Sequence, residues 1–252
     1  MTTTGQPYIS VVIPAFNEER RLGPTLESIA TYLSRQPFTW EIVVVDDGSS
    51  DGTTALVEPM HASEPRISVI RCTQNSGKGH AVRVGFLESN GAVVLFSDAD
   101  CSTPIEEFER LRAAIDAGAD VAIGSRAMPD SDVRVRQGVI RQTMGKTFNL
   151  LVRLATGLRL HDTQCGFKLF RRDRCLAAFR AQRLDGFAFD VELLFLAKRQ
   201  GLRISEVPVA WVNSPDSRVH MVRDSARMFR DLARIRWNAI TGRYDASPSR
   251  AS

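Results

Sequence analysis

The stretch AVVLFSDADCSTP, residues 92–104, decides how the rest of the sequence is interpreted. Its apolar part, residues 93–96, is typical of a buried strand, and Asp98 and Asp100 follow that strand directly. In an α/β pattern, open sheets bind ligands at the carboxyl ends of their strands. Two carboxylates at such a position are hard oxygen ligands that suit Mg²⁺ or Mn²⁺ and leave coordination positions for substrate phosphates. The alternative is an acidic turn that only caps the next helix.

The end of the same stretch predicts how that helix begins. Thr103 is expected as the N-cap, Pro104 as the first helical residue and Glu106 as the partner that completes a capping box. The helix itself is expected over residues 106–117. Asn17 is expected to cap an earlier helix, because it precedes apolar residues with helical spacing.

Strands and helices alternate up to Ser125, which predicts an α/β fold with a mostly parallel sheet. Apolar, β-branched runs predict five buried strands, at residues 8–14, 40–45, 66–71, 93–96 and 120–124. After Ser125 the expected elements are a polar loop, a helix at 139–158, a strand at 167–170, helices from 173 and near 190, a strand at 203–212 and a basic amphipathic helix at 219–240. We predict one domain over residues 1–246, with halves 8–125 and 126–246, and a disordered tail at 247–252.

Charge is divided unevenly between the two halves. Residues 1–125 carry 9 Lys and Arg against 17 Asp and Glu, whereas residues 126–252 carry 24 against 12. This division indicates an anionic partner for the second half, and a phosphate, an anionic membrane and a nucleic acid all qualify. Aromatic residues do not interleave with the arginines as stacking platforms require, which counts against nucleic-acid binding.

The remaining chemistry-bearing residues show no pattern of their own. The four cysteines lack metal-ligand spacing and predict reduced thiols rather than a zinc site or disulfides, and the four histidines share no metal-site spacing. No signal peptide opens the chain, and no run approaches the ~18 apolar residues of a membrane span. We therefore expect a cytoplasmic protein, peripheral at the inner face of the membrane. The helix at 139–158 is more typical of a core or dimer contact than of a membrane face, so a homodimer is a further expectation.

Polar residues follow three of the predicted strands. They are Asn17 and Glu18, Asp46 and Asp47, and Asp98 and Asp100. In a parallel sheet all of them fall on one edge and form one crevice, whose acidic rim can hydrogen-bond the ribose and base of a nucleotide. The segment 77–79 can add backbone donors and the cation of Lys78, a candidate nucleotide-sugar-binding residue, near a helix N-terminus. The spacing of a P-loop or of a dinucleotide-binding glycine motif is absent.

Eight segments together carry a resemblance to a known family. VVIPAFNEE, EIVVVDDGSSDGT, NSGKGHAV, LFSDADCSTP and IGSRA, in this order, resemble family 2 glycosyltransferases with the GT-A fold. The later DTQCGFKLF, FAFDVELLFLA and VPVAW resemble the dolichyl- or polyprenyl-phosphate glucosyltransferase branch, kin of dolichol-phosphate mannose synthases. The resemblance spans residues 9–244. It implies a Rossmann-like, mostly parallel central sheet flanked by helices, with C-terminal helices on the acceptor side.

The resemblance also implies roles for individual residues. Those lining the uridine pocket would be Pro14, Phe16, Glu18, Val45 and Asp47. Asp98 and Ala99 would lie beside the ribose and diphosphate, while Asp98 and Asp100 would hold the metal, with Ser102 as a further polar ligand. The phosphates of donor and acceptor would be bound by Arg126, Arg141 and Arg218, and Gln164 would face the sugar. The candidate catalytic residues are Asp100, Arg126 and Gln164.

Each of these residues also has a plain structural interpretation. Asp46 and Asp47 can simply form a turn after a strand, and Lys78 can be a solvated lysine at a helix start. Gln164 can serve only to hydrogen-bond the backbone of its own turn. Arg141 and Arg218 can be ordinary surface charges. The interpretation as a site therefore depends on all the motifs occurring together.

The implied reaction moves glucose from UDP-glucose to a polyprenyl phosphate with inversion, which gives a β-linked product. A phosphate monoester has a second pKa of about 6 and is largely ionised at neutral pH, so no general base is expected. If a base is needed, Asp190 or Asp162 is the candidate. The alternatives are transfer of mannose from GDP-mannose, a family 2 enzyme with a hydroxyl acceptor, and a nucleic-acid-binding module.

Overall fold

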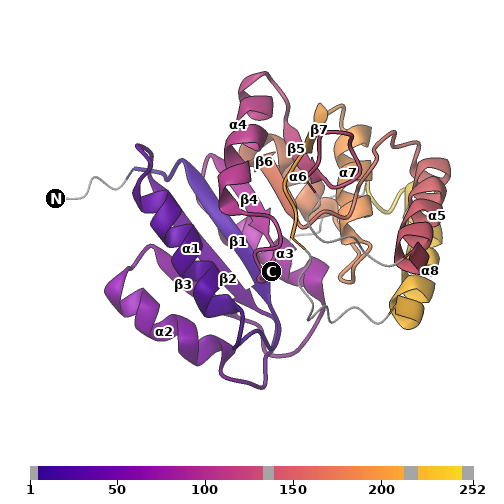
Figure 1. The fold of residues 1–252 in the computed structure, drawn as a ribbon. Helices are drawn as coiled ribbons and strands as arrows, with labels where there is room; N and C mark the ends of the chain where they lie inside the picture. Colours follow the sequence, from indigo (N-terminus) through magenta and orange to yellow (C-terminus); the bar gives the residue numbers. More distant parts are fainter. Residues whose placement is uncertain (1–4, 133–138, 213–220, 246–252) are drawn as a thin grey trace.

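A twisted seven-stranded sheet runs through the protein, with helices on both of its faces (Figure 1). The computed structural model describes residues 5–132, 139–212 and 221–245. The strands are β1 (Ile9–Ala15), β2 (Trp40–Asp46), β3 (Ile67–Arg71), β4 (Val93–Ser97), β5 (Val121–Ser125), β6 (Phe167–Arg171) and β7 (Ile204–Pro208). Their order in the sheet is β3-β2-β1-β4-β6-β5-β7. The sheet takes strands from both predicted halves of the chain, while the predicted domain limits stay a prediction.

The predicted mostly parallel sheet is confirmed, with one exception. β1 pairs in parallel with β2 and β4, β2 with β3, and β5 with β7. β6 is antiparallel to both of its neighbours, β4 and β5. The residues that precede β6 therefore lie at the edge where β4 and β5 end.

The helices are α1 (Leu22–Ser34), α2 (Thr53–Ser63), α3 (Lys78–Glu88), α4 (Phe108–Asp116), α5 (Val139–Thr156), α6 (Arg172–Ala181), α7 (Phe189–Arg199) and α8 (Met221–Ile240). Most agree with the predicted segments to within about two residues. α2 was not among the expected elements. It contains Pro59 and buries only Thr53, Thr54 and Val57, so its apolar pattern is weak.

Alternating side chains of the central strands build two separate hydrophobic cores. In β1, Val11 and Ile13 pack in the core that includes residues of α1 and α4, whereas Val12 packs in the core of α3, α6 and α7. This alternation is the two-residue period of a strand that is covered on both faces. α5 and α8 lie side by side at the far edge (Figure 1), where Phe148 and Phe229 meet edge to face with ring centroids 5.9 Å apart.

Both predicted helix caps are wrong. Pro104 has an extended ψ of 144°, and a 3₁₀ turn (Ile105–Glu107) precedes α4, so Thr103 and Glu106 form no capping box. The Thr103 hydroxyl instead lies 4.0 Å from Cys165 Sγ. Asn17 stands five residues before α1 in a left-handed conformation (φ 57°), and its side chain accepts a hydrogen bond from Ser50 N. In both places a contact with another segment outweighs the local capping preference.

Candidate active site

Asp98 follows β4 and is packed directly against the segment that leads into β6. Asp98 N donates a hydrogen bond to the carbonyl of Gly166 at 3.1 Å. A Cβ atom at position 166 would collide with the Asp98 carboxylate, so a larger residue there would have to displace this side chain. The close approach places the C-terminal half of the chain against Asp98, the first residue of the DAD turn (residues 98–100).

Lys78, the first residue of α3, pairs with Asp98. Its Nζ lies 2.7 Å from Asp98 Oδ1, and both side chains are half-buried. Burial alone would lower the pKa of Lys78, but the carboxylates of Asp98 and Asp190 outweigh it and raise the pKa above its ordinary value. Lys78 therefore stays charged at neutral pH and places a fixed cation at the sheet edge.

Asp100 lies in a tight turn beside a second cation. Its Oδ1 accepts a hydrogen bond from Ser102 N at 3.1 Å, and its Oδ2 lies 3.8 Å from Arg21 Nη1. Glu18 holds Arg21 through two hydrogen bonds of 2.7 and 2.5 Å. Cys101, between the two aspartates, has φ 50°, a conformation that non-glycine residues rarely adopt. The turn thus links the residues after β1 with those after β4.

Asp98 and Asp100 fit a hard divalent cation by their chemistry. Both are half-exposed carboxylates at the end of one strand, and Ser102, also half-buried, follows them. Carboxylate and hydroxyl oxygens are the ligands that Mg²⁺ and Mn²⁺ prefer. Lys78 and Arg21 each approach one of the two carboxylates, so a metal ion bound here would compete with these side-chain cations.

The two aspartates after β2 hold loops together. Asp46 accepts hydrogen bonds from Ser49 N at 2.9 Å and from the Thr54 hydroxyl. Asp47 accepts hydrogen bonds from Ser76 N at 3.1 Å and Gly77 N at 2.7 Å. Burial raises the pKa of the Asp47 carboxyl, and these backbone hydrogen bonds oppose the rise.

The expectation that segment 77–79 offers its backbone donors to a phosphate is wrong for two of its N–H groups. Gly77 N donates to Asp47, and Gly79 N donates to the carbonyl of Asp185 at 2.7 Å. The loop that contains Asp185 packs so closely on Gly77 (φ 114°) that a side chain would not fit there. The charge of Lys78 is therefore what this segment contributes to the edge.

Arg126 follows β5 and forms a bidentate ion pair with Asp162. Arg126 Nε lies 2.7 Å from Asp162 Oδ2 and Nη2 lies 2.9 Å from Oδ1, while Arg126 N donates to Oδ2 at 3.1 Å. Burial alone would raise the pKa of the Asp162 carboxyl, but the charge and hydrogen bonds of Arg126 hold it below its ordinary value. The pair fixes the guanidinium at the same sheet edge as Asp98.

A buried ion pair lies beside the site, and it was not among the predicted features. Lys168, in the middle of β6, is 1% exposed. Its Nζ lies 2.7 Å from Asp190 Oδ1 and also donates to the carbonyl of Cys165. Burial raises the pKa of Asp190, and the nearby charges of Lys168 and Lys78 oppose the rise. The available signal was a lysine inside the apolar run FKLF, because a buried lysine requires a partner.

The other predicted residues have mixed positions. Phe16 is 39% exposed, whereas Val45 and Ala99 are buried in the two cores. Gln164 is half-buried, with its N–H on Asp162 Oδ1 at 3.1 Å and its Nε2 3.9 Å from Met228 Sδ of α8. Pro14 is half-buried at the end of β1. Arg218 and the side chain of Arg141 lie outside the described residues.

The sheet thus carries acidic residues after β1, β2 and β4, with the cations of Lys78 and Arg21 beside Asp98 and Asp100. The profile of Glycosyl transferase family 2 matches residues 10–176, and the chain belongs to this family. It is 37% identical over 255 residues to a dolichyl-phosphate beta-glucosyltransferase of Saccharomyces cerevisiae, covering 94% of this chain and 76% of that protein. A dolichyl-phosphate beta-glucosyltransferase of Trichomonas vaginalis is 36% identical over 238 residues, covering 90% of this chain and 70% of that protein.

A solved structure has the same fold. Glucosyl-3-phosphoglycerate synthase from Mycobacterium tuberculosis, crystallised with Mn²⁺, UDP-glucose and phosphoglyceric acid, superposes with a TM-score of 0.68 at 19% identity, covering 92% of this chain and 80% of that one. The protein is thus a glycosyltransferase with the GT-A fold, homologous to dolichyl-phosphate beta-glucosyltransferases.

Proposed function

We propose that the protein transfers glucose from UDP-glucose to a polyprenyl phosphate of the dolichyl type, with inversion, to give a β-linked polyprenyl-phosphate glucose. The observation that carries this proposal is the identity of 36–37% with dolichyl-phosphate beta-glucosyltransferases over at least 90% of the chain. The UDP-glucose that accompanies the same fold in the mycobacterial synthase supports the choice of donor.

The donor would bind at the carboxyl ends of β1, β2 and β4. Asp98 and Asp100 would hold Mg²⁺ or Mn²⁺, which when bound stabilises the negative charge that develops on the leaving UDP. Lys78 orients Asp98 through the 2.7 Å ion pair and adds positive charge where the diphosphate arrives. Glu18, through Arg21, orients Asp100. Asp47 would accept a hydrogen bond from the uracil base.

Arg126 would bind the acceptor phosphate. A guanidinium has five N–H donors, and the hydrogen bonds of Arg126 to residues that the structure describes use only Nε and Nη2, which leaves donors for a phosphate oxygen. Its pairing with Asp162 fixes the plane of the guanidinium before the acceptor binds, which suits bidentate binding of a phosphate.

This chain needs no general base for such an acceptor. The acceptor is ionised before it binds, because the second pKa of a phosphate monoester is about 6. Asp190, the candidate base, is 4% exposed and already paired with Lys168, so its place in the structure is that of a support. Gln164, beside Asp162, would contact the sugar.

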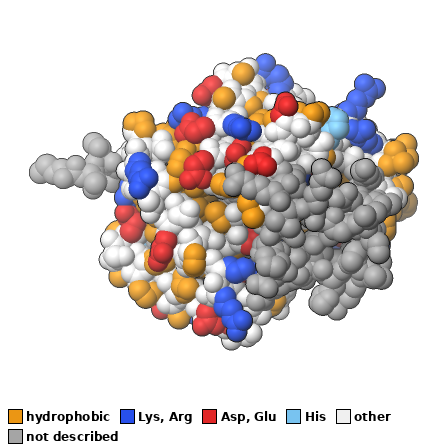
Figure 2. Space-filling view, viewed as in Figure 1, with side chains coloured by type: hydrophobic (Ala, Val, Ile, Leu, Met, Phe, Trp, Pro, Cys, Tyr) orange, Lys and Arg blue, Asp and Glu red, His pale blue; other side chains and the backbone are white. Residues whose placement is uncertain are grey.

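A surface formed by α5 and α8 would contact the membrane that contains the lipid acceptor. Apolar side chains are visible at the edge of the molecule where these two helices lie (Figure 2). The exposed apolar residues of the two helices include Leu150, Leu154, Trp237 and Ile240. Among the α8 arginines whose side chains the structure describes, the exposed ones are Arg227, Arg230, Arg234 and Arg236. Exposed apolar groups beside arginines are the composition of a helix that lies on an anionic bilayer, here at its inner face. No helix within the described ranges is long and apolar enough to cross a bilayer.

The test supplies the protein with Mn²⁺, a polyprenyl phosphate and radiolabelled UDP-glucose or GDP-mannose. We expect the label of UDP-glucose to enter the organic phase as a lipid-linked, β-configured sugar. If label enters the lipid only from GDP-mannose, the donor is GDP-mannose and the assignment of UDP-glucose is wrong. Label that enters hydroxyl-bearing glycans but never the polyprenyl phosphate would overturn the acceptor.

A further inference from the structure

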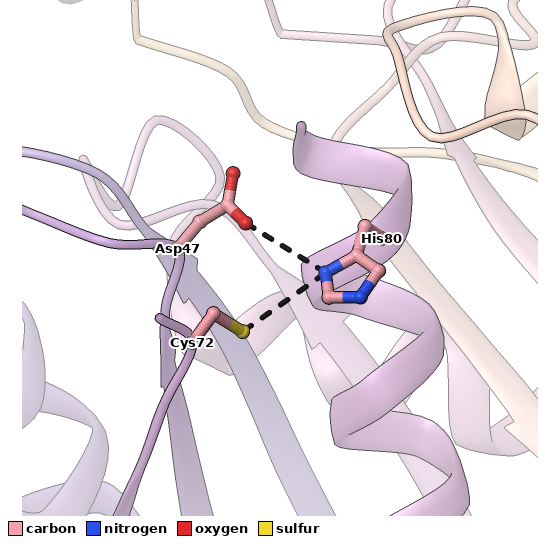
Figure 3. Close-up of side chains that lie close together, drawn as sticks. All are labelled: Asp47, Cys72 and His80. Atoms are coloured by element: carbon pink, nitrogen blue, oxygen red, sulfur yellow. Dashed lines mark hydrogen bonds and ion pairs between the residues drawn. The ribbon is translucent and has the colours of Figure 1, made fainter. Parts of the chain in front are cut away.

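Three potential metal ligands from three separate elements meet beside the end of β2. Asp47 follows β2, Cys72 follows β3, and His80 belongs to the first turn of α3 (Figure 3). His80 Nδ1 lies 3.7 Å from Asp47 Oδ1 and 3.9 Å from Cys72 Sγ, and all three ligand atoms are within 4.8 Å of one another. Across the ranges that the structure describes, this is the one group of three such ligand atoms.

We propose that Asp47, Cys72 and His80 form a binding site for Zn²⁺ or a similar transition-metal ion. A thiolate, an imidazole nitrogen and a carboxylate oxygen are the usual zinc ligands, with bonds of about 2.0–2.3 Å. In a tetrahedral arrangement such bonds place the ligand atoms roughly 3.3–3.7 Å apart. The two separations from His80 Nδ1 lie within a few tenths of an ångström of that range, and the third pair of ligand atoms lies within 4.8 Å, so small side-chain movements bring all three around one ion.

The surroundings of the three residues favour a metal. Asp47 is 3% exposed and is oriented by the N–H groups of Ser76 and Gly77, which act as outer-shell partners. Cys72 and His80 are only half-buried, so an ion can reach them from solvent. When the metal binds, a bond from zinc to sulfur replaces the S–H bond and one proton leaves to solvent. The two anions then balance the charge of the ion.

This site differs in chemistry from the aspartates of the DAD turn. Asp98 and Asp100 offer only oxygen, which suits Mg²⁺ or Mn²⁺, whereas sulfur and nitrogen ligands select zinc and its neighbours. The other cysteines do not form an equivalent site. Cys165 and Cys175 are fully buried in the cores, where an ion cannot reach them from solvent.

The site has a consequence for the enzyme, and this consequence rests on the proposed function. Asp47 is the carboxylate that we assign to the uracil base, so a zinc ion on Asp47 and a bound UDP-sugar exclude each other. Zinc would therefore inhibit transfer by competing with the donor. The metal site itself does not depend on that assignment.

The first experiment tests the metal site without using activity. The tag-free, metal-free protein is titrated with Co²⁺, and the near-ultraviolet band of a thiolate bound to cobalt is recorded. We expect the band in the wild type, its displacement by Zn²⁺, and its loss in Cys72→Ser. His80→Ala should weaken zinc binding by more than about 100-fold, since removing a ligand costs more than removing an outer-shell partner.

The matched control is Cys101→Ser, the other half-buried cysteine. It should keep the band. Absence of the band in the wild type, or a band that disappears with Cys101 instead of Cys72, would overturn the site.

The second experiment tests the overlap with the donor. Binding of UDP is measured with and without Zn²⁺ in the wild type and in Cys72→Ser. We expect zinc to weaken UDP binding in the wild type and to leave the serine variant unaffected. If the cobalt band depends on Cys72 but zinc does not change UDP binding, the metal site stands and the assignment of Asp47 to the base is wrong.

Discussion

Lys78 Nζ lies 2.7 Å from Asp98 Oδ1, so the helix that begins at Lys78 supplies a cation to the carboxylate at the end of β4. A divalent ion that binds Asp98 must share or replace this partner. The charge of Asp98 is thus balanced before any metal or nucleotide arrives, and the ion pair influences how strongly a metal binds alone.

Removing this cation should strengthen metal binding. In Lys78→Met, we expect the affinity for Mn²⁺ without nucleotide to rise about fivefold, which corresponds to about 1 kcal/mol for a half-exposed ion pair. Titration followed by the electron paramagnetic resonance of Mn²⁺ measures it. The control is Arg83→Met. Arg83 lies on the same helix but pairs with Asp185, so its removal should leave the affinity for Mn²⁺ unchanged. Unchanged Mn²⁺ binding in Lys78→Met would show that Lys78 does not compete with the metal.

Removing the Asp100 carboxylate should stop transfer. We expect Asp100→Ala to lower kcat/KM at least about 100-fold, the size of the loss when one group that stabilises a developing charge is removed. The rate of label transfer from UDP-glucose to polyprenyl phosphate measures it. Asp116→Ala, an exposed aspartate at the end of α4, is the control. Full activity of Asp100→Ala in the presence of a chelator would end the metal proposal.

A methyl group at position 166 should disturb the metal ligand more than the fold. In Gly166→Ala the new Cβ displaces the Asp98 carboxylate, so Mn²⁺ binding should weaken at least tenfold while the protein loses about 1–3 kcal/mol of stability from overpacking. Mn²⁺ titration and urea unfolding measure the two effects. Gly145→Ala adds the same methyl group in α5 where nothing lies within 4 Å, and it should lower neither the affinity for Mn²⁺ nor the free energy of unfolding. Native Mn²⁺ affinity in Gly166→Ala would contradict the packing argument.

The Arg126–Asp162 pair should make stability depend on pH in the acid range. The pKa of Asp162 is lower in the folded chain, so its stabilisation is complete above the unfolded pKa of about 3.9 and is lost as the pH falls through the folded pKa. Asp162→Asn should therefore lower the free energy of unfolding by about 3 kcal/mol at neutral pH, and this difference should shrink below about pH 4. Urea titrations at several pH values measure it. A difference that stays constant down to the lowest pH would exclude the ion pair as its source.

Reversing one charge on α8 should weaken membrane binding. Each basic residue near an anionic surface contributes about 1 kcal/mol, so Arg234→Glu should lower binding to phosphatidylserine-containing vesicles at least tenfold. Vesicle sedimentation measures it. Arg35→Glu makes the same change at the exposed end of α1 and should have little effect. Equal losses in the two variants would show that net charge alone, and no particular surface, accounts for binding.

The parts of the site that lie close together in sequence were predictable. Asp98 and Asp100 follow the end of β4 by one and three residues, and a strand in a parallel sheet delivers them to its carboxyl edge whatever the rest of the chain does. The same reasoning placed Asp47 and Lys78 at this edge. It did not foresee that Asp47 holds the loop amides of Ser76 and Gly77.

The parts that depend on the return of the chain were not predictable. Lys168 finds Asp190, and Gly166 makes room for Asp98, only because β6 enters the sheet between β4 and β5 in the opposite direction. Thr103 shows the same limit, since a local capping pattern lost to a contact with distant Cys165. Periodicity along the chain carries no information about such pairings.

The antiparallel position of β6 has a consequence for how the protein is made. β4 and β5 are not neighbours, so a nascent chain that has emerged only as far as β5 has an open edge on β4 and nothing to attach β5 to. The sheet closes only when residues 167–171 leave the ribosome and bridge the gap, and unpaired strand edges invite aggregation until then. The sheet edge that carries Asp98 and Arg126 is therefore assembled late in synthesis. Truncated chains released before that point should be degraded by proteases or bound by chaperones.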